Sequence, residues 1–141
     1  MNIQSGQDNT LIEQAHLVRR TVFIEEQGID PALEYDTLDS DCFHVVLFEA
    51  TVPVATARLR PIGDGIGKVE RVATIQQARG KGYAQAVMRH IEEMAEAQGL
   101  TTLKLGAQLT ALSFYERLGY EPYGEPFVDA NLPHRMMQKT W

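Results

Sequence analysis

A glycine-rich basic loop, Arg79-Gly80-Lys81-Gly82, lies between an apolar run that ends near residue 75 and a helical apolar pattern that begins near residue 84. Its two glycines permit positive φ angles and a close approach to the backbone, and its two cations add charged donors. The first N–H groups of a helix lack intrahelical partners, and the helix dipole favours negative charge beside them. The loop therefore predicts an anion-binding site in a chain whose net charge is −6.

Two common phosphate-binding patterns fit this loop poorly. A Walker A loop requires Ser or Thr directly after its Lys, but Gly82 follows Lys81. A dinucleotide fingerprint requires a third glycine at the position of Gln85. Taken alone, the loop fits equally well a solvent-facing turn in which Arg79 and Lys81 only increase solubility.

The neighbouring residues resemble the GNAT superfamily, the acetyl-CoA-dependent N-acyltransferases. Arg79-x-x-Gly82-x-Ala84 is similar to the R/Q-x-x-G-x-G/A signature that cradles the coenzyme A pyrophosphate in that family. A second register, Gln77-x-x-Gly80-x-Gly82, also fits, but the helical apolar pattern follows the Arg79 register as it does in the family. The segment ALSFYERLGY (111–120) resembles the family's A-x-x-F-Y-x-x-x-G-F/Y motif.

Two further segments are similar to a branch of small, mostly uncharacterised bacterial GNAT proteins. They are LVRRTVFIEEQGI (17–29), which resembles L-R-x-x-V-F-x-x-E-Q, and LPH (132–134). The resemblance implies one α/β (α+β) domain over residues 1–141, with a central mixed, mostly antiparallel sheet. This sheet would be splayed to admit the pantetheine arm and would contain a βαβ acetyl-CoA-binding core.

The same resemblance implies which residues bind the coenzyme. They are Val72, Thr74, Arg79, Gly80, Lys81, Gly82, Tyr83, Ala84 and Gln108. The Val72 backbone would stabilise the acyl oxygen, and Thr74 would bond the pantetheine, although an ordinary buried strand explains both residues as well. Gln108 stands where many family members have Asn, seven residues before the tyrosine.

Amine acylation requires a proton acceptor for the amine and a proton donor for the departing thiolate. Tyr115 occupies the family's donor position, and the alternative is a core aromatic. Glu70 is the preferred acceptor, because desolvation in an apolar strand would raise its pKa toward neutrality; a salt-bridged strand Glu is the alternative. His134 competes for this role, since imidazole titrates near neutral pH. The resemblance also implies that Glu26 and Gln27 face the acceptor, although a polar helix end explains them equally well.

Hydrophobic spacing predicts the elements that would position these residues. Helices are expected over 8–27, 81–98 and 109–120, and strands over 43–50, 52–61, 68–75, 100–107, 121–128 and 133–140. The order strand, helix, strand over 68–107 predicts a βαβ unit with parallel pairing. The acidic segment 29–42 predicts a loop with at most a short helix.

Composition indicates one soluble, cytoplasmic globular domain. The net charge of −6 disfavours general binding to nucleic acid or anionic membranes. The single cysteine, Cys42, excludes an intrachain disulfide. The histidines lack metal-ligand spacing, so no metal is expected. No basic, apolar signal sequence and no apolar run of roughly 20 residues is present.

The expected partners are acetyl-CoA as cosubstrate and a small-molecule or peptide amine as acceptor, and a homodimer is left open. The main alternative function is a non-catalytic acyl-CoA-binding or sensing domain. Acyl-homoserine-lactone synthases share the expected fold and a faint similarity at VFIEEQ, but this chain is short for them.

Overall fold

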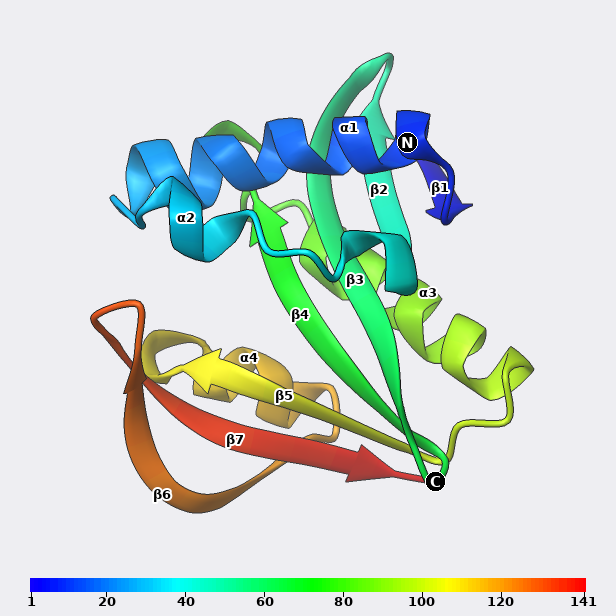
Figure 1. Cartoon of the computed structure of the whole chain (residues 1–141), viewed down its shortest axis with the longest axis vertical. Helices are drawn as coiled ribbons and strands as arrows, with labels where there is room; N and C mark the ends of the chain where they lie inside the picture. Colours follow the sequence, from blue (N-terminus) through cyan, green and yellow to red (C-terminus); the bar gives the residue numbers. More distant parts are fainter.

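The computed structural model describes all 141 residues and contains one seven-stranded sheet with helices on both faces (Figure 1). The strand order in the sheet is β1-β2-β3-β4-β5-β7-β6. Every neighbouring pair is antiparallel except β4 and β5, which are parallel. The predicted α/β domain with a mixed, mostly antiparallel sheet is confirmed.

The strands are β1 (Asn2–Gly6), β2 (Phe43–Glu49), β3 (Val52–Gly63), β4 (Ile66–Thr74), β5 (Thr102–Gln108), β6 (Glu121–Asp129) and β7 (Leu132–Thr140). The α-helices are α1 (Asn9–Arg19), α2 (Pro31–Glu34), α3 (Tyr83–Ala97) and α4 (Leu112–Arg117). A π-helical segment, Arg20–Glu26, continues α1, and single 3-10 turns occupy Asp39–Asp41, Gln76–Ala78 and Leu109–Ala111.

All the predicted helices and strands are present, with ends shifted by no more than three residues. Strand β1 was not predicted, because its sequence, NIQSG, is mostly polar and its residues are mostly exposed. It is an edge strand that pairs with β2. No helix is both long enough and apolar enough to cross a membrane.

The helices α1 and α3 cover opposite faces of the sheet. Val46 of β2 packs in one cluster with Leu11 of α1, whereas its neighbour Val45 belongs to the larger core that contains Val87 of α3. Successive side chains of a strand point to opposite faces. In Figure 1, α1 accordingly crosses in front of the sheet and α3 lies behind it.

The strands of the βαβ unit meet only at one end. β4 and β5 pair over three residue pairs, Ile66–Lys68 with Thr102–Lys104. A Cβ on Gly67 would lie 2.8 Å from Leu59 and 2.9 Å from Leu100, so a larger residue would require these side chains to shift. Beyond it the two strands diverge, as Figure 1 shows.

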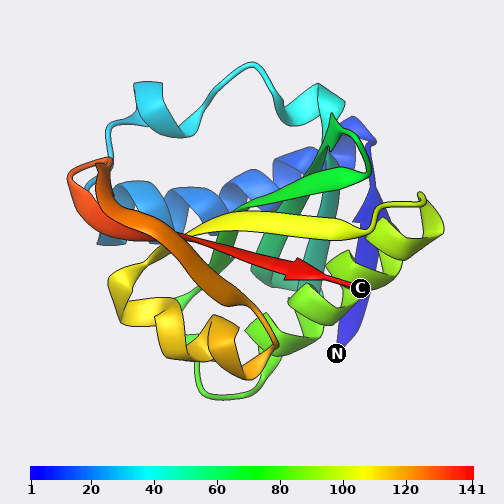
Figure 2. The same cartoon turned by 90° about the horizontal axis from the view of Figure 1, so that it is seen from below.

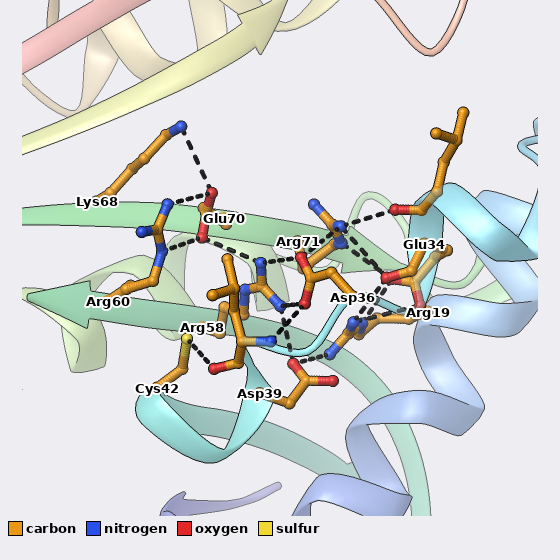
Figure 3. Close-up of polar contacts among 12 residues, drawn as sticks. Arg19, Glu34, Asp36, Asp39, Cys42, Arg58, Arg60, Lys68, Glu70 and Arg71 are labelled. Atoms are coloured by element: carbon orange, nitrogen blue, oxygen red, sulfur yellow. Dashed lines mark hydrogen bonds and ion pairs between the residues drawn. The ribbon is translucent and has the colours of Figure 1, made fainter.

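The segment 29–42, which includes α2, lies over the sheet and carries a buried ionic network (Figure 3). We use this name for Arg19, Glu34, Asp36, Asp39, Arg58, Glu70 and Arg71. In Figure 2 this segment, in cyan, lies on the opposite side of the sheet from α4. The predicted loop with a short helix is confirmed, but the sequence did not reveal its ion pairs.

The Arg58 guanidinium, which is 1% exposed, is the centre of the network. Its Nη1 donates to Asp36 (3.0 Å) and Asp39 (2.9 Å), and its Nη2 donates to Asp36 (2.8 Å) and Glu70 (3.1 Å). Burying a charge is costly unless charged hydrogen bonds replace its water. The hydrogen bond from Arg58, together with nearby positive charge, lowers the pKa of Asp36 to about 2 although burial opposes this.

This pKa predicts an acid-sensitive contribution to stability. A carboxyl group whose pKa is lower in the folded than in the unfolded protein stabilises above its unfolded pKa, and the stabilisation is lost as pH falls through the folded pKa. Asp36→Asn should lower the free energy of unfolding at pH 7 by about 1–2 kcal/mol. The deficit relative to the wild type should shrink between about pH 4 and pH 2, as measured by urea unfolding.

Asp41→Asn is the matched control, because Asp41 is exposed and belongs to the same segment. It should leave the unfolding free energy unchanged across this range. A deficit for Asp36→Asn that stays constant down to pH 2 would contradict the ion-pair explanation.

Candidate active site

The diverging ends of β4 and β5 enclose the main cleft, which has a volume of about 730 Å³. Residues 68–74 and 105–108 line it from the two strands. The π-helical segment and α2 border it on one side, and the β6–β7 hairpin on the other. The predicted catalytic residues Glu70, Tyr115 and His134 all line this cleft, although they come from β4, α4 and β7.

A β-bulge interrupts β4 beside the main cleft. The three steps from Glu70 to Ala73 match two steps along β3, so one residue within Arg71–Val72 is extra to the ladder. Arg71 has a φ of 58°, which is uncommon for a residue other than glycine. Val72, which was predicted to stabilise the acyl oxygen, lies in the bulge and lines the cleft.

The side chain of Arg71 ties this bulge to the segment 29–42. Its Nε donates to Glu34 Oε1 (3.1 Å), and its Nη2 donates to the Leu33 and Glu34 carbonyl oxygens (3.2 Å each) and to Asp36 Oδ2 (3.2 Å). Arg71 was not among the residues predicted for the site. The signal that could have revealed it is a second charged residue directly after Glu70, in a strand that is otherwise largely apolar.

The glycine-rich loop and the start of α3 form a second cavity of about 420 Å³. Gly80 and Gly82 have φ angles of 81° and 79°. A Cβ on either would meet nothing within 4 Å, so glycine suits these positions for its backbone freedom and not for lack of space. The backbone N–H groups of residues 80–85 donate to no other group of the protein. Such unpaired donors at a helix N-terminus suit an anionic ligand.

The two cations of the loop are each paired with a carboxylate. Arg79 donates to Glu26 and lines both cavities. Lys81 Nζ donates to Glu49 (2.9 Å), as does the Tyr83 hydroxyl (2.6 Å), and Lys81 lines neither cavity. That the Lys81 ammonium binds the anion stays a prediction; in the structure this group is paired with Glu49 and lies outside both cavities.

The other residues predicted to bind the coenzyme lie along one continuous path. Those that line the main cleft are Val72, Thr74, Arg79, Ala84 and Gln108. Those that line the second cavity are Thr74, Arg79, Gly80, Gly82, Tyr83 and Ala84. Gln108 Nε2 also donates to Gln27 Oε1 (3.2 Å), which joins β5 to the end of the first helical segment.

Tyr115 is buried against the edges of two aromatic rings. Its ring centroid lies 4.9 Å from that of Phe114 and 5.9 Å from that of Tyr120. Burial raises the pKa of the Tyr115 phenol well above its usual range. The protonated phenol is a hydrogen-bond donor at the wall of the cleft.

His134 is held in one tautomer when it is neutral. Its Nδ1 lies 2.8 Å from the Leu132 carbonyl oxygen, which can only accept a hydrogen bond. Nδ1 therefore carries the proton, and Nε2 carries the lone pair. Phe127 stacks on the imidazole with a centroid separation of 5.7 Å. This arrangement makes Nε2 available to accept a proton.

Glu70 lies in the main cleft but is surrounded by cations. Arg60 Nε lies 3.0 Å from its carboxylate, Arg58 Nη2 3.1 Å and Lys68 Nζ 3.5 Å. Burial raises the pKa of Glu70, but the hydrogen bond from Arg60 and the three positive charges outweigh it, so the pKa lies below its ordinary value. The expectation of a raised pKa is therefore wrong, because the basic neighbours on β3 and β4 keep the carboxylate ionised.

The β6–β7 hairpin, which carries the predicted His134, adds site residues that the sequence did not reveal. Phe127, Asp129 and Leu132 line the main cleft beside His134. The hairpin turns at Ala130 and Asn131, whose φ angles are 49° and 64°.

No group of three or more His, Cys, Asp or Glu side chains is arranged to hold a metal ion.

Comparison with known proteins identifies the family. The model of the acetyltransferase (GNAT) domain matches residues 10–141. A Bacillus subtilis protein named as an acetyltransferase is 36% identical over 99% of this chain and 96% of its own length. The crystal structure of a protein assigned as an N-acetyltransferase from Lactobacillus plantarum superposes with a TM-score of 0.92. It is 31% identical, over 99% of this chain and 97% of that one.

A more distant likeness concerns the fold alone. An aminoglycoside 6'-N-acetyltransferase solved with coenzyme A is 17% identical, with a TM-score of 0.76 over 99% of this chain and 97% of that one. The full-length relatives and the splayed sheet lead to the same conclusion. The chain belongs to the GNAT family of acetyltransferases.

Proposed function

We propose that this protein transfers an acetyl group from acetyl-CoA to the amine of an acceptor. The observation that carries the proposal is the continuity between the unpaired N–H groups of residues 80–85 and the main cleft. Thr74, Arg79 and Ala84 line both cavities, so one elongated ligand can reach from the anion site to the reacting groups. The fold of the aminoglycoside acetyltransferase accommodates coenzyme A, which supports the same use here.

The loop and the cleft would bind different parts of the coenzyme. The N–H groups of residues 80–85 are donors for the diphosphate, and the helix dipole of α3 adds favourable charge. The exposed edge of β4 near Thr74 and the Gln108 amide offer hydrogen-bonding groups to the uncharged arm. The backbone N–H of Lys81 is one of these donors, while its ammonium is paired with Glu49.

The bound coenzyme would supply an acyl group activated as a thioester. His134 Nε2 accepts the proton that the acceptor amine loses as its nitrogen bonds to the acyl carbon. The backbone N–H of Val72 donates to the acyl oxygen as negative charge develops there. Tyr115 donates its proton to the sulfur as the carbon–sulfur bond breaks. Glu70 orients the amine as an ionised carboxylate.

The anion site can be tested by substitutions at Gly82. Asp and Asn have nearly the same shape and both tolerate the left-handed backbone conformation that Gly82 adopts. Gly82→Asp should weaken acetyl-CoA binding at least about tenfold more than Gly82→Asn, because only Asp brings negative charge to the diphosphate. Calorimetric titration measures both affinities.

Equal affinities in the two folded Gly82 variants would contradict the proposed coenzyme site. Wild-type binding without release of the thiol, over a broad panel of amines, would favour a non-catalytic acyl-CoA-binding domain instead.

The proton donor can be tested with Tyr115→Phe, which keeps the ring contacts and removes the hydroxyl. We expect kcat to fall roughly 10- to 1,000-fold, because the thiolate must then leave without a proton donor. The affinity for acetyl-CoA should stay unchanged. The variant needs both steady-state rates and calorimetry, and wild-type turnover would assign Tyr115 to the core.

The proton acceptor can be tested by comparing His134→Asn with Glu70→Gln. Asn can keep the hydrogen bond to the Leu132 carbonyl but lacks the Nε2 lone pair. His134→Asn should lower kcat/KM roughly 100-fold or more at neutral pH and recover at high pH, where free amine is abundant. Glu70→Gln should lower the rate without altering the pH profile. If a pH series shows instead that Glu70→Gln changes the pH profile and His134→Asn does not, Glu70 is the base.

A further inference from the structure

Arg79 and Glu26 form a two-point ion pair at the junction of the two cavities. Nη1 of Arg79 donates to Oε2 of Glu26 (2.8 Å), and Nη2 donates to Oε1 (2.6 Å). Nε of Arg79 donates to the Thr74 carbonyl oxygen (3.0 Å). Arg79 and Thr74 line both cavities, whereas Glu26 lines only the main cleft. One guanidinium thus lies between the proposed diphosphate site and the acceptor side.

Little free energy is lost when Arg79 leaves Glu26 for another anion. The Arg79 and Glu26 side chains are 42% and 35% exposed, and exposed pairs contribute little to stability. A diphosphate carries more negative charge than a carboxylate and also accepts two parallel hydrogen bonds from a guanidinium. An anion bound at residues 80–85 would therefore compete well for Arg79, which directly precedes them.

Glu26 differs from the other glutamates of the main cleft in its partners. Glu34 is held by Arg19 and Arg71, and Glu70 by Arg58 and Arg60. These pairs are mostly buried and belong to the fold. The one cation paired with Glu26 is Arg79, so loss of that contact would leave Glu26 with uncompensated negative charge.

We propose that Arg79 exchanges Glu26 for the coenzyme diphosphate, and that Glu26 then binds a second, cationic group of the acceptor. The acceptor class is a diamine: one amine is acetylated in its neutral form, while the other remains an ammonium at Glu26. Val22 and Phe23, from the same π-helical segment, line the cleft and offer apolar surface to the methylene spacer. The inference rests on the proposed coenzyme site. Under this proposal Glu26 determines acceptor specificity, and its carboxylate becomes available to the acceptor when the coenzyme binds Arg79.

The exchange is tested by calorimetric titration of the wild type, Glu26→Gln and Glu25→Gln. Glu25 is the matched control, because it is the exposed neighbour of Glu26 and is not part of an ion pair at the cavities. Glu26→Gln should bind coenzyme A roughly two- to fivefold more tightly than the wild type, because Arg79 is no longer held by a charge. Pantetheine, which lacks the diphosphate, should bind all three proteins equally.

Two results would overturn the exchange, and they are distinguishable. The exchange alone is contradicted if Glu26→Gln and Glu25→Gln bind coenzyme A with equal affinity. It is also contradicted if Glu26→Gln binds pantetheine more tightly by the same factor as coenzyme A. Failure of every protein to bind coenzyme A overturns the proposed coenzyme site as well.

The acceptor class is tested by steady-state rates with acetyl-CoA and either 1,4-diaminobutane or butylamine, which has the same chain length and one amine. The wild type should prefer the diamine by about tenfold or more in kcat/KM, through KM. Glu26→Gln should lose that preference, whereas Glu25→Gln should keep it. A preference that survives in Glu26→Gln, or a wild type that favours butylamine or acetylates neither amine, overturns the assignment of Glu26.

Discussion

The buried guanidinium of Arg58 must have anionic partners, and much of the structure around the cleft satisfies that requirement. No water can replace those partners, because the side chain is 1% exposed. Two of its carboxylates come from the segment 29–42 and one from β4. The irregular, acidic segment is thereby held against the sheet. Arg19 extends the same requirement to α1, through Glu34 and Asp39.

The same network separates the charged groups of the cleft from the groups suited to proton transfer. It keeps Glu70 ionised among cations, and it ties the β4 bulge to α2 through Arg71. Tyr115 and His134 lie outside the network, on α4 and β7, where neither forms an ion pair. A phenol that keeps its proton and an imidazole nitrogen with a free lone pair are well suited to give and accept protons. The ion-paired groups therefore lie on β3, β4 and α2, apart from Tyr115 and His134 on α4 and β7.

The sequence predicted well the features that depend on local pattern. The spacing of apolar residues located α3 and its neighbouring strands. The two motifs identified Tyr115 and Gly82, which line two cavities that have lining residues in common. Prediction from the sequence failed for features that depend on which charged side chains lie close together in the fold. The pKa of Glu70 was misjudged because Arg58 and Arg60 approach it across the β3–β4 ladder. The pairing of Lys81 with Glu49 was not predicted, because the two residues are 32 positions apart in the chain.

The sheet has two parts that meet only at the closed end near Gly67. One part contains β1 to β4, the other contains β5, β7 and β6, and three residue pairs join them. A side chain larger than hydrogen at residue 67 would require Leu59, Leu100 or Leu103 to shift, because these leucines pack tightly around the glycine. The spacing of the two parts at this edge therefore depends on that packing. A substitution at this closed end would alter the shape of the cleft without replacing any side chain that lines it.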